Sequence, residues 1–124
     1  MPAMTAEQKK ALLLLKFIIF NYHGMDVEEK KILQKDADDI DGKADLEWVE
    51  EFVSKDENTS FERAREFFRK TIGTYDVATK VSYLKIVWES TRTKGYISEM
   101  EATAILKLAK DWAVQKELLK LIRK

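Results

Sequence analysis

An apolar run near the N-terminus constrains the fold most, because the helix that it predicts is hydrophobic on nearly every face. Residues 12–20 read Leu-Leu-Leu-Leu-Lys-Phe-Ile-Ile-Phe, and the only charge among them is Lys16. A helix that is apolar all round needs other elements packed about it. The run is too short to cross a bilayer, which takes about 20 apolar residues. We therefore expect a buried central helix and no membrane span.

The same run could belong to a secretory signal peptide, because Lys9 and Lys10 precede it. A signal peptide ends in small residues at its cleavage site, and none follow here. Residues 21–24 instead read Asn-Tyr-His-Gly, and an ordinary helical pattern comes next. We therefore favour the buried helix and expect a cytoplasmic protein.

Glycines and capping residues divide the chain into helical segments. The one proline is Pro2, so no interior residue forbids a long helix. Four glycines could each end a helix in the left-handed conformation: Gly24, Gly42, Gly73 and Gly95. Helix starts are indicated by the capping box, in which an oxygen side chain and an acid or amide three residues later bond each other's backbone amides. It fits at Thr5-x-x-Gln8, Asp26-x-x-Glu29, Thr59-x-x-Glu62 and Ser98-x-x-Glu101.

Between these marks, apolar residues recur at intervals of three and four, as on one face of a helix. The stripes are Leu46, Val49, Phe52 and Val53; Phe61, Ala64, Phe67, Phe68 and Ile72; Val77, Val81, Leu84, Val87 and Trp88; and Ile105, Leu108, Ala109 and Trp112. No alternating strand pattern is present. The sequence predicts one all-α domain over residues 1–124. Its seven or so helices lie near 5–23, 26–37, 45–55, 60–72, 76–93, 98–111 and 113–123.

The stripes also predict the core. We expect the residues at matching positions on the two longest helices to be buried: Leu14, Phe17, Ile18, Leu84 and Trp88. Trp48 and Trp112 are expected in the core as well, because each lies on or beside a stripe.

Charge and residue content exclude several functional classes. The 22 basic residues are balanced by 22 acidic ones, so we expect no nucleic-acid partner, which would require a surplus of cations. The middle of the chain is acidic and its C-terminal part is basic. There is no cysteine and one histidine, which removes the common nucleophile–base pairs. No glycine-rich phosphate loop occurs either, and we expect a protein that is not an enzyme.

The stretch from Asp36 to Asp45 invites comparison with a calcium-binding loop. With Gly42 at the sixth position of such a loop, Ala37 would be first and Trp48 twelfth. Both positions require a carboxylate, so the match fails. We expect residues 36–45 to form a solvated acidic loop, and residues 55–58 to form another.

Two segments of the chain resemble each other. Each runs from a long apolar helix through a glycine and one apolar residue into a capped second helix. The first contains Gly24-Met25-Asp26-Val27-Glu28-Glu29, and the second contains Gly95-Tyr96-Ile97-Ser98-Glu99-Met100-Glu101. The pattern predicts a helical hairpin used twice.

These two turns resemble those of the TerB-like domains, named for a bacterial tellurite-resistance protein. The family's hallmark is a long apolar helix ending in Ala-Asp-Gly, followed by Ile-Ser or Ile-Asp, two variable residues and Glu. The resemblance implies a bacterial helical domain, linked to stress or tellurite response, that acts by binding. It also implies a divalent-cation site formed by the aspartate before the glycine and the later glutamate.

This chain departs from the family at that aspartate, where it has His23 and Lys94. A protonated lysine cannot ligate a cation, so we expect no site at the second turn, although Glu101 keeps the glutamate position. At the first turn, His23 with Asp26 and Glu29 would suit a transition metal. Alternatively, His23 helps to end the first helix while the two acids cap the second.

We expect a metal-independent protein-interaction module that keeps the family scaffold, needs no cofactor and binds an unidentified protein partner. The alternative is a module that binds or senses a divalent cation at the first glycine turn. The departures at His23 and Lys94 favour the first interpretation. The sequence does not indicate an oligomeric state.

Overall fold

The computed structural model describes residues 5–21, 26–92 and 99–122, and all regular structure in these ranges is helical. The α-helices are α1 (Ala6–Phe20), α2 (Val27–Asp39), α3 (Lys43–Ser54), α4 (Ser60–Lys70), α5 (Val77–Arg92), α6 (Glu99–Asp111) and α7 (Gln115–Ile122). Two short 3-10 helices, η2 (Glu57–Thr59) and η3 (Ile72–Thr74), flank α4. With seven α-helices and no strand in the described ranges, the all-α prediction is confirmed.

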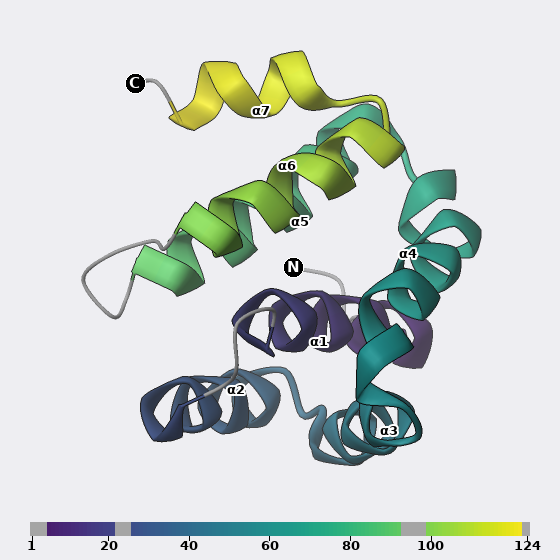
Figure 1. Cartoon of the computed structure of the whole chain (residues 1–124), viewed down its shortest axis with the longest axis vertical. Helices are drawn as coiled ribbons and strands as arrows, with labels where there is room; N and C mark the ends of the chain where they lie inside the picture. Colours follow the sequence, from purple (N-terminus) through teal and green to yellow (C-terminus); the bar gives the residue numbers. More distant parts are fainter. Residues whose placement is uncertain (1–4, 22–25, 93–98, 123–124) are drawn as a thin grey trace.

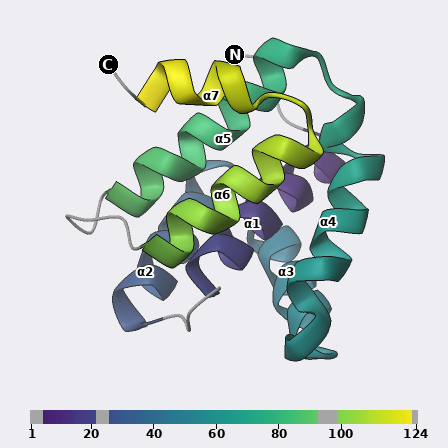
Figure 2. The same cartoon turned by 45° about the horizontal axis from the view of Figure 1, so that its top comes forward.

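Helix α1 lies at the centre of the fold, as its apolar sequence predicts. It packs against α2, α3, α4, α5 and α6, whereas α7 packs on α5 and α6. Figure 1 shows α1 between the α2–α3 pair on one side and the α5–α6–α7 group on the other, with α4 along the flank. Figure 2 shows the same arrangement from a second direction. Within the described ranges, the structure has no helix long and apolar enough to span a membrane.

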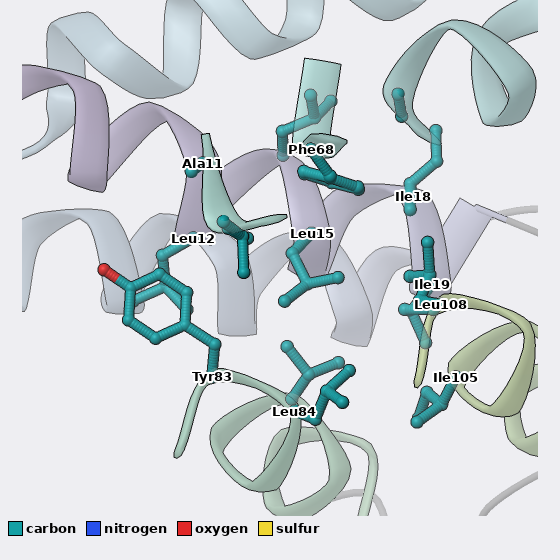
Figure 3. Packing of buried hydrophobic residues seen from close by; sticks show 14 of the residues in the cluster. Ala11, Leu12, Leu15, Ile18, Ile19, Phe68, Tyr83, Leu84, Ile105 and Leu108 are labelled. Carbon is teal, nitrogen blue, oxygen red and sulfur yellow. The ribbon is translucent and has the colours of Figure 1, made fainter. Parts of the chain in front are cut away.

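The core forms where other helices meet α1. Figure 3 shows Leu15 of α1 between Leu84 of α5 and Phe68 of α4. Of the five residues predicted to be buried, Leu14, Ile18 and Leu84 are at most 2% exposed. Trp112 is also buried, but Phe17, Trp48 and Trp88 are only partly buried at the edge of the core. Val77 of the third stripe is 51% exposed, because it begins α5 on the solvent side.

The one charge in the apolar run is accommodated by an ion pair. The Lys16 side chain is 8% exposed, and its Nζ lies 2.8 Å from Asp36 Oδ2 on α2. A buried ammonium group requires such a partner, since an uncompensated charge in the interior costs several kcal/mol. The pair joins α1 to α2.

The prediction of a loop over residues 36–45 is wrong. Helix α2 continues to Asp39 and α3 begins at Lys43, so the connection is the short segment 40–42. The amide of Asp41 donates to the Asp38 carbonyl, and that of Gly42 donates to the Ala37 carbonyl. These are the two bonds of a Schellman motif, which ends a helix tightly. The segment expected as a loop at 55–58 also contains the start of η2.

The prediction that glycines end helices in the left-handed conformation is wrong at Gly42, whose φ is −114°. The residues with positive φ in the described ranges are Asp41 (54°) and Ala113 (58°). Gly42 is instead closely packed: a Cβ there would lie 3.2 Å from both Leu13 Cδ1 and Ile40 Cγ1, so these side chains would have to shift slightly. Gly24 and Gly95 lie outside the described residues.

Two of the predicted capping boxes are present, at Thr5 with Gln8 and at Asp26 with Glu29. The box predicted at Thr59 is absent: the Thr59 side chain makes no capping bond, because η2 leads directly into α4. The structure adds a cap that the sequence analysis missed, in which Asp76 Oδ1 accepts from the Thr79 amide at the start of α5. Ser98, the first residue of the fourth box, lies outside the described residues.

Candidate functional site

The acids of the first glycine turn are engaged in capping α2. Asp26 Oδ1 accepts from the Glu29 amide at 2.8 Å, and Glu29 Oε1 accepts from the Asp26 amide at 3.2 Å. Asp26 is exposed, whereas Glu29 is fully buried. Both carboxylates therefore stabilise the start of α2 by accepting hydrogen bonds from its first backbone amides. His23, the third proposed ligand, lies outside the described residues.

The fourth cation candidate, Glu101, is in the first turn of α6 and is fully buried. Over residues 5–21, 26–92 and 99–122, no three His, Asp or Glu side chains lie together as a ligand set. A site that uses His23 involves a residue beyond these ranges, so the cation alternative stays a prediction.

A groove runs beside the C-terminal half of α1, between α2 and α3. Its volume is about 690 Å³. The apolar lining consists of Phe17, Leu33, Leu46 and Val53, and the polar lining of Asn21, Lys30, Gln34, Glu50, Glu51, Ser54 and Glu57. A smaller hollow of about 280 Å³, next to α4, shares Asn21 and Glu57 with it. The two hollows therefore adjoin at the end of α1.

The turn between α2 and α3 explains where the groove opens. It packs on the N-terminal half of α1: Gly42 fits against Leu13, and Lys9 Nζ donates to the Asp41 carbonyl at 3.1 Å. The groove extends toward the other end of the pair. Its lining there is Lys30, Leu33 and Gln34 of α2 and Glu50, Glu51, Val53 and Ser54 of α3, and Leu46 lines it nearer the turn. The tight turn thus holds both helices on α1 at one end and leaves the groove at the other.

The groove has an acidic rim formed by Glu50, Glu51 and Glu57. All three residues are exposed, and the one cation in the lining is Lys30. In the described part of the chain, none of these three carboxylates forms an ion pair or accepts a hydrogen bond. The rim therefore presents three glutamates without a cationic partner.

The charge of the surrounding helices has the same sign. Residues 26–59, which include α2, α3 and η2, contain 13 acidic and 5 basic side chains, a net charge of −8. The rest of the chain contains 9 acidic and 17 basic side chains, a net charge of +8. The zero balance of the whole chain thus conceals one strongly acidic region, and the groove lies within it.

The sequence pattern does not single out the groove as a site. Phe17 was expected in the core, and Lys30, Gln34 and Glu50 were not singled out. The acidic middle of the chain was a visible signal, but it does not show which acids share a surface. That depends on how α2 and α3 lie on α1, which is a tertiary property.

No family model, curated protein or solved structure matches the chain. The resemblance to TerB-like domains therefore rests on the residues of the two glycine turns. Helices α1 and α2 contact each other, and so do α5 and α6. The turns themselves fall at residues 22–25 and 93–98, outside the described residues.

Proposed function

We propose that this chain is a non-catalytic protein-interaction module and that its partner binds in the groove beside α1. The main support for this proposal is the groove, where the apolar side chain of Phe17 is partly exposed among polar side chains. Binding sites of this kind join an apolar interior to a polar rim that gives specificity. Three helices form its walls, so the surface is preformed and a partner can bind with little rearrangement.

The resemblance to TerB-like domains supports a setting for this module. On that basis we propose a bacterial, cytoplasmic domain that acts in stress or tellurite response and needs no bound metal. The supporting residues are Gly95 to Glu101, together with the replacement of the metal-binding aspartate by Lys94. The caps made by Asp26 and Glu29 also support a structural task for the first turn.

A steric block of the groove tests the proposal. Gln34 and Lys35 are exposed neighbours on α2, but Gln34 lines the groove and Lys35 does not. A displayed library of 16-residue peptides is selected on the wild-type protein, and the selected peptides are measured against Gln34→Trp and Lys35→Trp. We expect Gln34→Trp to weaken binding at least tenfold, while Lys35→Trp stays within threefold of wild type.

Two results would contradict the proposal. One is a selection that yields no binding peptide, and the other is equal binding to both tryptophan variants. A rise in Tm with Zn²⁺, Ni²⁺ or Mn²⁺ that His23→Ala abolishes would instead support the cation-binding alternative. A free metal-ion concentration of a hundred times the Kd adds about 2.7 kcal/mol to the free energy of unfolding, which a thermal melt resolves.

A further inference from the structure

We infer that the groove binds a basic, amphipathic helical segment of a partner protein. This inference rests on the proposed function and names the chemistry of the partner. It follows from two properties of the groove, its shape and its charge.

The shape suits a helix. Phe17, Leu33 and Leu46 come from three different helices and line one groove, with Val53 further along α3. A helix laid in such a groove inserts apolar residues from one face, at spacings of three, four and seven. Because Leu33, Leu46 and Val53 are almost fully buried, the partly exposed Phe17 offers the main apolar contact. The remaining contacts are with the polar rim.

The charge selects a basic segment. The three rim glutamates exceed the one lining cation, Lys30, by two negative charges. Lysine or arginine side chains flanking the apolar face of the partner would pair with Glu50, Glu51 and Glu57. The net charge of −8 over residues 26–59 would also attract such a segment over a distance and raise its association rate. The same charge repels the phosphates of a nucleic acid, which disfavours that class of partner.

Two synthetic peptides of 18 residues provide the probe. Both carry leucine at positions i, i+3, i+4 and i+7 of a helix; one has lysine at the remaining charged positions and the other has glutamate. Binding is measured by fluorescence anisotropy at 50 and 300 mM NaCl. We expect the lysine peptide to bind at least tenfold more tightly than the glutamate peptide, with the difference shrinking at high salt because ions screen exposed charges.

A matched pair of triple variants assigns the binding to the rim. Glu50→Gln, Glu51→Gln and Glu57→Gln together remove the rim charge. Asp38→Asn, Asp39→Asn and Glu47→Gln remove the same charge from exposed positions of the same region that do not line the groove. An exposed ion pair is worth about 1.5- to 5-fold in affinity, so the rim variant should lose about tenfold for the lysine peptide. The control variant should lose less than threefold.

Several outcomes would overturn the inference. Equal losses of affinity for the lysine peptide in the two triple variants would mean general attraction to an acidic surface. Equal affinities of the lysine and glutamate peptides would mean that the groove does not distinguish the charge of its ligand. If library peptides bind the groove and lose affinity in Gln34→Trp but are not basic, the proposed function holds and this inference fails. A concentration-dependent dimer that the rim variant dissociates would make the occupant a second copy of this chain.

Discussion

Single residues that end helices depart from the rule that glycine occupies the left-handed position. Helix α6 is followed by Ala113 at a φ of 58°, and α2 is followed by Asp41 at 54°. Both sites are Schellman motifs; at α6, the Val114 amide donates to the Ala109 carbonyl at 2.9 Å. A side chain with a Cβ is strained in this conformation by about 1–2 kcal/mol. The Schellman motifs at Asp41 and Ala113 thus form without glycine, the residue that adopts positive φ without strain.

Replacing Ala113 with glycine is therefore expected to stabilise the protein. Relief of the strain exceeds the extra entropy that glycine adds to the unfolded chain, about 0.4–1 kcal/mol, so the net gain is about 0.5–1 kcal/mol. Urea unfolding at pH 7 measures it. The matched control is Ala102→Gly inside α6, which should cost about 1 kcal/mol because glycine disfavours a helix interior. A loss of stability in Ala113→Gly would contradict the strain at this position.

At the scale of helices, an ion pair joins α4 to the end of α6. Arg65 Nε donates to Asp111 Oδ2 at 2.7 Å, and Arg65 Nη2 donates to Asp111 Oδ1 at 2.8 Å. The Asp111 side chain is only 10% exposed. The hydrogen bonds from Arg65 hold the pKa of Asp111 below its ordinary value of 3.8, against the opposing effect of burial. Two parallel hydrogen bonds to a charged group make this a strong contact.

The contribution of this pair to stability should depend on pH. Because the pKa of Asp111 is lower in the folded state, the folded protein binds fewer protons, and the contribution is present in full above about pH 4. It is lost as the pH falls through the lowered pKa. At pH 7, Asp111→Asn should lower the free energy of unfolding by about 2 kcal/mol, the range for hydrogen bonds to charged groups.

Urea unfolding at several pH values checks this expectation. The difference between wild type and Asp111→Asn should shrink below pH 4, because the wild-type carboxyl becomes neutral as well. Glu62→Gln is the control: Glu62 also contacts Arg65 but is 70% exposed, so its loss should cost less than about 0.5 kcal/mol. A difference that persists unchanged at pH 2 would show that the charge of Asp111 is not what matters.

For the whole molecule, α1 separates a closed side from an open side. On the closed side, Phe68 is fully buried and meets Trp112 edge to face, with ring centroids 5.8 Å apart. On the open side, Phe17 lines the groove and remains partly exposed. The two phenylalanines should therefore contribute differently to stability.

Phe68→Ala should cost about 3–5 kcal/mol, the range for a buried aromatic side chain. Phe17→Ala should cost about 1–2 kcal/mol, because less apolar surface is removed from water there. Chemical denaturation of the two variants compares them directly. Equal costs would show that the groove is closed in solution. Equal costs would also match the sequence-based prediction that Phe17 lies in the core.

Local pattern was sufficient for the helices and for much of the core. The apolar spacing predicted seven helices, and the oxygen side chains of Thr5 and Asp26 correctly marked two of their starts. Leu14, Ile18 and Leu84 are buried as predicted. These features depend on residues three or four apart on one helix, whose relation is already present in the sequence. The cation role considered for Asp26 and Glu29 came from the family resemblance, whereas local reasoning predicted a capping box, and the bonds that the structure shows for them are caps.

Tertiary structure alone decided the connection between α2 and α3 and the position of the groove. Residues 36–45 look like a solvated loop, yet Asp36 stays helical and pairs with Lys16, twenty positions earlier. Gly42 packs closely against Leu13 of α1, a neighbour that no local pattern reveals. Glu50, Glu51 and Glu57 share a rim only because of how α3 and η2 are placed beside α1 and α2. Contacts between helices depend on how they lie against one another, and residues far apart in the chain set that arrangement together.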